Sequence, residues 1–455
     1  MLTRMLAELE SLQQVNIASG ATRFGLVRAC DGGMVEVSGL PIPVGTVCRI
    51  ATPQSDTSQT SSSVAAETVG FRDGHSLMML LGDSVLLQPG ARVQAEGVPG
   101  MVPVGEAFLG RAVDGTGQPI DGGPAIRAQA FWPLGGKREG ALDRASVVEP
   151  FDCGVRSINA LATLGVGQRM GIVAGSGVGK SVLLDMIVNH AQSDIIIVAL
   201  IGERAREVSD FVRRHMQQDR RARTAIIAVP ADHASNLRLR GAQAAMALAE
   251  YFRSRGQQVT LIMDSLTRVA HAAREIGLLL GEPGAARGYP PSALAAITRL
   301  VERAGNARQS GGAITGLFTV LADGDNHDDP VVDTARAILD GHIVLSRDLA
   351  QRGQYPAIDV PASLSRVMSD VASPEHLAHA RDFRAMVADY EANRDLVLMG
   401  AYREGVDLRI DRALAMQDPM RSFLMQDHDA ACSLAGSIAA LDHLLEASPA
   451  PASAR

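Results

Sequence analysis

The chain has 455 residues, a formal net charge of −7 and aromatic side chains at only 4% of its positions. A chain this long exceeds one ordinary hydrophobic core, so we expect two or three domains. The acidic balance and the scarcity of aromatic residues argue against a nucleic-acid-binding protein, which needs a basic surface and stacking platforms. The four cysteines are widely separated, which argues against a zinc site or a disulfide framework. The sequence shows neither a run of eighteen apolar residues nor a signal-peptide pattern, so we expect a cytoplasmic protein.

The first twenty residues carry leucine and methionine at helical spacing, which predicts an amphipathic helix over residues 1–20. Its apolar stripe needs a cover. The stripe can pack on the body of the protein, bind a partner helix or touch a membrane surface, and the pattern alone does not choose among these.

Residues 21–98 contain short β-rich runs separated by turn signals such as Asp73-Gly74, which predicts a small β-barrel or sandwich domain. Residues 53–63 are rich in Ser, Thr and Gln and predict a solvated loop. Residues 99–147 are dense in Gly and Pro at their start and predict a segment connecting two domains. The expected strands are 24–29, 34–37, 46–50, 76–81 and 84–87.

A glycine-rich loop at residues 174–181 reads A-G-S-G-V-G-K-S and stands between an apolar run and an apolar helical stretch. In such a loop, backbone N–H groups and the helix N-terminus bind phosphates. Lys180 then reaches the β- and γ-phosphates, and the Ser181 hydroxyl is offered to Mg²⁺. The expected ATP-binding residues are Gly175, Ser176, Gly177, Val178, Gly179, Lys180 and Ser181.

The apolar runs that follow this loop alternate with helical patterns, which predicts an α/β domain with a parallel sheet buried on both faces over residues 148–370. The runs are residues 195–201, 225–229, 259–263 and 314–321. Such sheets bind ligands at the carboxyl ends of their strands. We expect a helical domain over residues 371–446 and a disordered tail over residues 447–455.

Two carboxylates follow apolar runs, Asp264 directly and Glu203 after Gly202. Asp264 can hold Mg²⁺ opposite Ser181, although an Asp in this place also caps helices. Glu203 can orient the water that attacks a phosphate, but an ion pair with Arg204 or Arg206 explains it equally well from spacing alone.

Three further features have an ordinary explanation beside a functional one. Tyr355 can stack on adenine, whereas an aromatic beside a proline more often packs in a core. Arg366, taken alone, is a surface arginine. Residues 323–329 hold four aspartates but lack the order of an EF-hand, which favours a solvated loop.

Longer motifs between residues 148 and 368 resemble the flagellar protein-export ATPases, which are related to the catalytic subunit of rotary ATP synthases and to the ATPases of virulence type III secretion. The phosphate loop and its continuation, A-G-S-G-V-G-K-S-V-L-L, are similar to the flagellar form. The other matching stretches are I-G-E-R-A-R-E-V at 201–208, M-D-S-L-T-R-V-A-H-A-A-R-E-I-G at 263–277, G-Y-P-P-S at 288–292, L-V-E-R-A-G-N at 300–306, I-L-D-G-H-I-V-L-S-R at 338–347 and residues 355–368.

The resemblance implies a RecA-like P-loop NTPase core with an N-terminal small β-barrel and a C-terminal helical domain, which binds ATP and Mg²⁺ and hydrolyses the nucleotide. It implies that Glu203 is the catalytic carboxylate and that Asp264 belongs to the metal site. Tyr355 matches the adenine-stacking tyrosine, and Phe423 is a looser match to the aromatic that covers the other face of the base. Arg204 and Arg268 are expected near the γ-phosphate, with Lys180 and Arg366 completing the catalytic set.

Arg366 matches an arginine that is donated to the nucleotide of a neighbouring subunit, so the resemblance implies a homohexameric ring. The acidic loop at residues 323–329 would face the centre of that ring. Two departures from the family pattern concern loop conformation: Ala205 replaces a usual Gly, and Gly284-Ala285-Ala286 replaces a Pro-containing stretch.

The implied partners are a flagellar export regulator bound through the N-terminal helix, the export gate, chaperones and export substrates, at the cytoplasmic face of the membrane and without nucleic acid. A virulence type III secretion ATPase, an ATP synthase-type subunit, a nucleic-acid translocase and a non-hydrolysing ring protein remain as alternatives.

Overall fold

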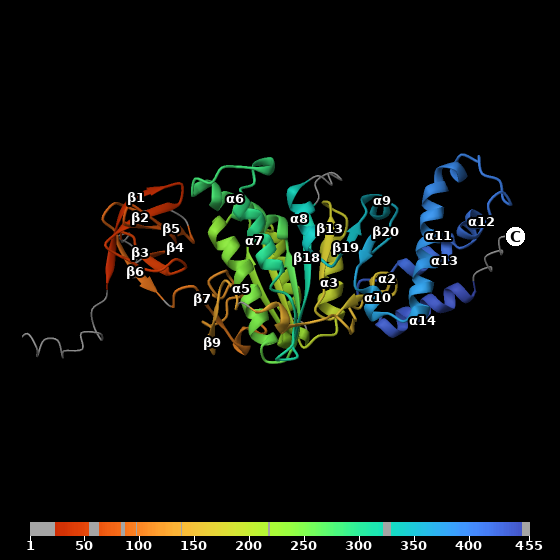
Figure 1. Ribbon diagram of the computed structural model, residues 1–455, viewed down its shortest axis with the longest axis horizontal. Coiled ribbons are helices and arrows are strands. Elements are labelled where there is room, and N and C mark those ends of the chain that lie inside the picture. The colour runs from red at the N-terminus through yellow and green to blue at the C-terminus, as the bar shows by residue number, and fades with distance from the viewer. Residues whose placement is uncertain are drawn as a thin grey trace, which may run out of the picture. The chain divides into compact units, whose positions relative to one another are not determined.

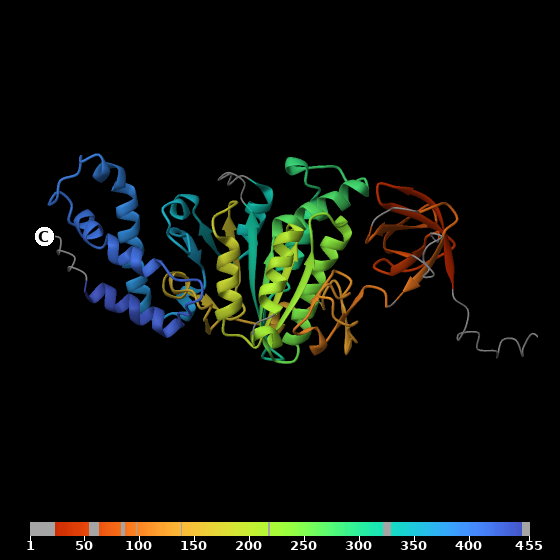
Figure 2. The same cartoon turned by 180° about the vertical axis from the view of Figure 1, so that it is seen from behind.

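The computed structural model describes residues 23–53, 63–82, 87–96, 98–137, 139–216, 219–321 and 329–447. These residues form two compact units, Met1–Met101 and Val102–Arg455, of which Figures 1 and 2 show two opposite views. The predicted N-terminal helix, most of the predicted strand at 84–87, most of the acidic loop and the C-terminal tail lie outside the described residues. None of the helices in the described ranges is long and apolar enough to cross a membrane.

The first unit is a closed barrel with the strand order β1-β2-β5-β4-β3-β6, which confirms the predicted barrel. Alternate side chains such as Val35, Val37, Cys48 and Ile50 fill its interior, because successive residues of a strand point to opposite faces. The strands are β1 Phe24–Asp31, β2 Met34–Ser38, β3 Val47–Ala51, β4 Ser63–Arg72, β5 His75–Leu80 and β6 Arg92–Glu96.

The second unit is built on a sheet whose central strands are parallel, as predicted, in the order β20-β19-β13-β18-β16-β14-β15-β8. Only β20 runs antiparallel to its neighbour in this series. The strands are β8 Ala112–Val113, β13 Arg169–Ala174, β14 Ile195–Ile201, β15 Thr224–Val229, β16 Gln258–Asp264, β18 Ala313–Leu321, β19 Gly341–Leu345 and β20 Ile358–Ser365.

Helices cover both faces of the central strands β13, β14, β15, β16 and β18, which explains why these strands are apolar without alternation. Helices α3 (Lys180–His190) and α4 (Ala205–Met216) share one core with Ile196 and Val198 of β14. On the other face lie α5 (Ser235–Arg253) and α6 (Leu266–Leu279), with Gly241 of α5 against Val229 and Ile201. The carboxyl ends of the parallel strands lie together at one end of the sheet, which is where such sheets bind ligands.

Residues 99–147, expected to be a connection between domains, add β8 to the edge of the sheet beside β15. Asp121 fixes this segment, since its carboxylate accepts hydrogen bonds from Arg111 Nε at 2.7 Å and from the Ala112 N–H at 3.0 Å. From Val102 onward the segment thus folds as part of the second unit.

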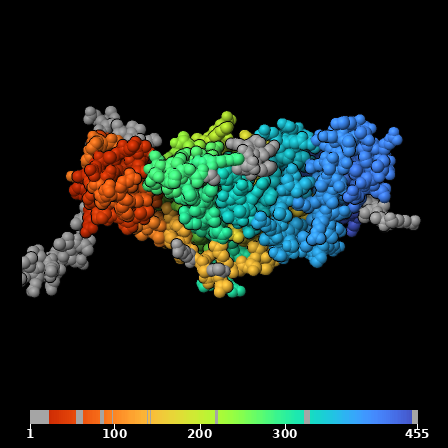
Figure 3. All heavy atoms as spheres, turned by 45° about the horizontal axis from the view of Figure 1, so that its top comes forward, coloured from red at the N-terminus to blue at the C-terminus, as the bar shows by residue number. Residues whose placement is uncertain are grey.

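The C-terminal region is helical, with loops over residues 399–407 and 425–433. Its long helix α11 packs on α14 and on the short helix α2, with Phe383 fully buried between them and the sheet core. Figure 3 shows the surface of this helical region in blue. The remaining helices of the unit are α2 Arg156–Leu161, α7 Pro291–Val301, α8 Pro330–Ile338, α9 Arg347–Gln351, α10 Met368–Val371, α11 Pro374–Leu398, α12 Leu408–Ala415, α13 Gln417–Leu424 and α14 Leu434–Glu446.

Candidate active site

The predicted phosphate loop connects β13 to α3, as its position in the sequence requires. Gly177 and Gly179 have φ angles of 76° and 87°, in the left-handed region that glycine adopts without a steric penalty. Gly179 is the N-cap of α3, and no side chain caps this helix. The N–H groups of the first helical turn can therefore donate hydrogen bonds to a bound phosphate.

Lys180 brings together the two carboxylates that the sequence singled out. Its Nζ donates to Glu203 Oε1 at 3.3 Å and forms a shorter hydrogen bond with Asp264 Oδ1. The three side chains are 12%, 11% and 7% exposed, in that order. They come from separate elements: Lys180 from the start of α3, Glu203 from the residues after β14 and Asp264 from the end of β16.

The burial of Glu203 has an electrostatic consequence. Burial, and next the neighbouring Asp264 carboxylate, raise the pKa of Glu203, while Lys180 opposes the rise. A carboxylate in this state takes up a proton more readily than one in water, which suits a group that accepts a proton from an attacking water.

Thr319 is a member of this cluster that sequence reasoning missed. It lies on β18, between β13 and β16 in the sheet, and is fully buried. Its Oγ1 donates to Asp264 Oδ1 at 2.6 Å. The only signal in the sequence is a threonine inside an otherwise apolar run, which β-strands commonly contain.

Two arginines expected near the γ-phosphate differ in their surroundings. Arg268, in the first turn of α6, approaches Gly202 so closely that a Cβ there would lie 2.9 Å from the Arg268 Cβ, and its charge acts on Glu203. Its Nε is buried without a hydrogen-bond partner in the ranges that the structure describes. The Arg204 side chain is 81% exposed, with Nη1 3.7 Å from Glu207 Oε1. Arg268 therefore lies beside the cluster, and Arg204 extends into solvent.

Tyr355 lies against the phosphate loop. A Cβ at Gly179 would be 3.3 Å from the Tyr355 ring, and the tyrosine remains 43% exposed. The ring thus offers an open apolar surface next to the loop, on which a base can stack.

Phe423 is not beside Tyr355 on such a surface but in the hydrophobic core. It is 4% exposed, and its ring centroid is 5.2 Å from that of Phe383. The chain that follows it does approach Tyr355, because the Gln426 N–H donates to the Tyr355 carbonyl at 3.0 Å. Gln426 fixes this approach, since its buried amide also bonds to the Gly154 carbonyl at 2.9 Å.

Arg366 lies at the amino end of β13, whereas the phosphate loop follows the carboxyl end of that strand. Strand β20 runs antiparallel to β19 and ends with Ser365 beside Gly341, the first residue of β19. The Arg366 N–H donates to Asp340, whose own N–H donates to Arg169 at the start of β13. The exposed Arg366 side chain is therefore level with the beginning of β13, whereas the phosphate loop follows its end.

A cavity of about 140 Å³ opens beside the buried cluster, and its lining includes Ser181, Glu203, Asp264 and Arg214. These residues fit ATP with Mg²⁺. The loop supplies uncapped N–H groups, Lys180 and Arg268 supply positive charge, and the Ser181 hydroxyl and the Asp264 carboxylate are oxygen donors of the kind that Mg²⁺ prefers.

The sequence matches two family models. Residues 154–365 match the ATP synthase alpha/beta family nucleotide-binding domain, and residues 372–443 match the T3SS EscN ATPase C-terminal domain. The boundary between the two falls where β20 ends and the helical region begins.

Full-length relatives agree with both matches. The flagellum-specific ATP synthase of Salmonella typhimurium strain LT2 is 45% identical over 449 residues, which are 97% of this chain and 98% of the relative. The type 3 secretion system ATPase of Xanthomonas euvesicatoria is 42% identical over 93% of this chain and 96% of the relative.

A solved structure has the same fold. The assembled ATPase EscN of enteropathogenic E. coli, in complex with its central stalk EscO, superposes with a TM-score of 0.83 at 35% identity and covers 92% of this chain and 100% of EscN. The RecA-like core, the N-terminal barrel and the helical C-terminal region are thus common to both proteins. The chain belongs to the family of flagellum-specific and type III secretion ATPases.

Proposed function

We propose that the Lys180–Glu203–Asp264 cluster is the hydrolytic centre of a homohexameric ATPase that drives protein export through the flagellar type III apparatus. The observation that supports this proposal is the position of Arg366, which is level with the amino end of β13, whereas the cluster lies at the carboxyl ends of the strands. An arginine in that position suits a role at the site of a neighbouring subunit.

Residues 175–181 hold the phosphates through backbone N–H groups, with Lys180 as the point charge between them. Ser181 and Asp264 would hold Mg²⁺, which would neutralise the negative charge that develops on the phosphate oxygens. When phosphate is bound, Lys180 has a further anionic partner, and its hydrogen bonds to the two carboxylates become weaker.

Glu203 is the base in this proposal. Its buried carboxylate orients a water and accepts its proton, and the raised pKa makes that acceptance favourable. Arg268 stabilises negative charge next to Glu203, and Tyr355 stacks on the base. The exposure of Arg204 makes it a candidate for contact with phosphate or with a neighbouring subunit.

Arg366 reaches the nucleotide of the neighbouring subunit in the ring. In a head-to-tail interface, the surface of one subunit that carries Arg366 would meet the surface of the next subunit that carries the phosphate loop. Such interfaces can close into rings. Arginines supplied in this way accelerate phosphoryl transfer by about 10³–10⁵-fold.

We further propose that the ring acts at the cytoplasmic face of the membrane with a regulator, a stalk, the export gate, chaperones and export substrates. The structure of the assembled E. coli relative with its central stalk supports the ring and the stalk. The wording of the phosphate loop supports the flagellar system over a virulence system. Restored swimming in a flagellar ATPase deletion strain tests that choice, and restored virulence secretion alone would reverse it.

The test of the catalytic proposal is phosphate release as a function of protein concentration, with the assembly state followed by native mass spectrometry. Activity should rise cooperatively as rings form. Lys180→Ala should lose nucleotide binding, whereas Glu203→Gln and Arg366→Ala should bind nucleotide without hydrolysing it.

Arg206→Ala is the matched control, because the Arg206 side chain is 92% exposed on α4. It should behave as the unmodified chain. A monomer that hydrolyses ATP at the full rate would refute the shared site, and full activity in Glu203→Gln would refute the assignment of the base.

A further inference from the structure

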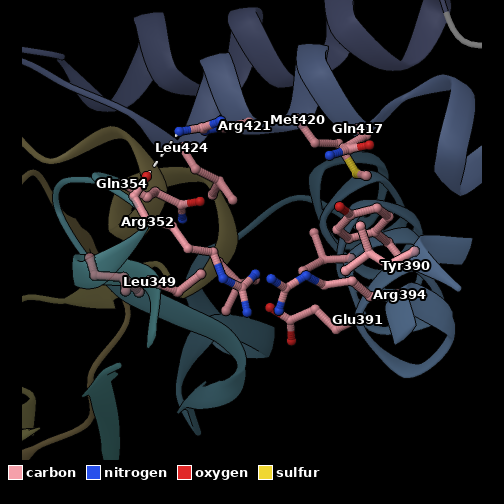
Figure 4. A pocket seen from close by; sticks show the side chains of 14 residues that line it. Leu349, Arg352, Gln354, Tyr390, Glu391, Arg394, Gln417, Met420, Arg421 and Leu424 are labelled. Carbon is pink, nitrogen blue, oxygen red and sulfur yellow. Dashed lines mark hydrogen bonds between the residues drawn. The ribbon is translucent and has the colours of Figure 1, made fainter. Parts of the chain in front are cut away.

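A second cavity, of about 310 Å³, lies between the sheet region and the C-terminal helices. Its walls come from α9 and β20 on one side and from α11 and α13 on the other (Figure 4). Sites for small molecules usually measure about 300–1,000 Å³, so the cavity is large enough for one organic molecule. None of the residues assigned above to catalysis or nucleotide binding lines it.

Positive charge gathers at this cavity. Arg352, Arg394 and Arg421 line it, and Glu391 is the one acidic residue among its lining residues. Figure 4 shows the guanidinium groups of Arg352 and Arg394 pointing toward each other across the cavity, with Glu391 beside them. Two guanidinium groups in this arrangement repel each other unless an anion lies between them.

The neighbouring carboxylates neutralise this charge only in part. Asp348 pairs with Arg352 and lies 3.9 Å from Arg394 Nη1, but its side chain is 60% exposed and therefore well screened. Partial burial, and next Asp359, raise the pKa of Glu391. The Arg352 Nε is buried without a hydrogen-bond partner in the parts of the chain that are described. The Arg352 Nε–H thus remains to be satisfied at the cavity.

Apart from Gln354 and Gln417, the rest of the lining is apolar or aromatic. Leu349, Ile358, Val360, Val387 and Leu424 are each less than 9% exposed in the whole structure, yet all border the open space. Tyr390 adds an aromatic ring. A cavity with apolar walls and convergent arginines suits a molecule that has an apolar body and one anionic group, because arginine binds carboxylate, sulfonate and phosphate oxygens with paired hydrogen bonds.

We propose that this cavity is a binding site for a small amphipathic anion, an aromatic carboxylate, sulfonate or phosphate ester, held by Arg352 and Arg394. Its position would let such a ligand influence nucleotide binding through the neighbouring segment of the chain. Gln354 lines the cavity and directly precedes Tyr355, so a ligand there contacts the segment that carries the stacking tyrosine. Binding of the anion and binding of nucleotide are then coupled, a consequence that rests on the proposed role of Tyr355.

The test uses 8-anilinonaphthalene-1-sulfonate, a fluorescent aromatic sulfonate, titrated into the full chain. We expect saturable binding that the double variant Arg352→Gln/Arg394→Gln weakens about tenfold or more, since hydrogen bonds to charged groups are lost. Arg381→Gln is the matched control, because Arg381 is exposed on the same helix α11 as Arg394 and does not line the cavity. It should bind the dye like the unmodified chain.

A neutral relative of the dye, N-phenyl-1-naphthylamine, separates recognition of the anion from simple apolar adsorption. It should bind weakly to every variant. Val387→Phe, which fills the cavity from α11 and leaves the arginines in place, should also abolish binding of the sulfonate, and thermal unfolding of each variant checks that it is folded. Equal dye binding by the unmodified chain and by the double variant would overturn the site.

The coupling has its own readout, which does not depend on hydrolysis. Saturating ADP should change the dissociation constant of the dye by at least severalfold in the unmodified chain, and this effect should vanish in Tyr355→Ala. A dissociation constant that ADP leaves unchanged would overturn the coupling. Dye binding by a chain that cannot hydrolyse ATP would separate the anion site from the proposed catalytic function.

Discussion

An equal mixture of the Arg366→Ala and Lys180→Ala variants should recover ATP hydrolysis that neither variant has alone. The Arg366→Ala subunit keeps an intact phosphate loop, and the Lys180→Ala subunit keeps an intact arginine. When the two are neighbours in the correct order, one complete site forms at their boundary.

The expected recovery of activity depends on how far Arg366 lies from the phosphate loop of its own subunit. Arg366 is level with Arg169, and β13 runs from Arg169 to Ala174 before the loop begins. Five steps of about 3.3 Å put the loop about 17 Å away, roughly twice the Debye length of about 8 Å at physiological ionic strength. Arg366 therefore cannot stabilise charge at its own site. Random assembly completes a site when an intact loop, present in half of the subunits, meets an intact arginine, present in half of the neighbours, so about one site in four regains activity.

The assay is phosphate release after the two variants are dissociated, mixed and reassembled, with ring formation verified by native mass spectrometry. Each variant alone should be reduced by about 10³–10⁵-fold, so recovery to even a few per cent of full activity is unmistakable. Lys180→Ala mixed with the Lys180→Ala/Arg366→Ala double variant is the control, since no subunit in it has an intact loop. A mixture no more active than the sum of its components would refute the shared site.

Three other predictions test single contacts. Thr319→Val should raise the Mg²⁺ concentration for half-maximal hydrolysis about 10–100-fold, because Asp264 loses an orienting hydrogen bond. Thr319→Ser should keep that hydrogen bond and the original Mg²⁺ dependence, and titration of phosphate release with Mg²⁺ distinguishes the two variants. Tyr355→Ala should weaken ATP binding by the roughly 1–3 kcal/mol of one stacked base, whereas Tyr355→Phe should not, as measured by calorimetry. Arg111 holds the pKa of Asp121 well below its usual range, so this pair stabilises the fold above about pH 4 and the stabilisation is lost as the pH falls further. Asp121→Asn should remove that pH dependence and lower the free energy of unfolding by about 3 kcal/mol in urea titrations, and an unchanged profile would contradict this.

The centre of the fold was predictable from the sequence because its signal is local. Strands β14, β16 and β18 are continuous apolar runs, and the loop at 174–181 carries its own glycine pattern. The meeting of Lys180, Glu203 and Asp264 was predictable as well, since the carboxyl ends of parallel strands lie at one edge of a sheet.

What the sequence did not reveal depends on contacts between distant residues. Strand β20 reads I-D-V-P-A-S-L-S, with a proline and small polar residues, and no apolar run announces it. Phe423 could not be distinguished from an exposed aromatic, because its contact with Phe383 joins residues 40 positions apart. Thr319 was missed for the same reason, since its hydroxyl has meaning only beside Asp264.

Strand β20 has a consequence for the timing of hydrolysis. It begins three residues after Tyr355 and ends directly before Arg366, so one strand joins the residue proposed to stack on a subunit's own base to the residue proposed to reach the neighbour's phosphate. Strand β20 is paired with β19 at both of its ends, with a register shift between them, so a displacement near Tyr355 can be carried through this strand pair to Arg366. In the proposed ring, arrival of a nucleotide in one subunit would thus set the position of the arginine in the next site, and hydrolysis would pass around the ring in order instead of occurring at all sites at once.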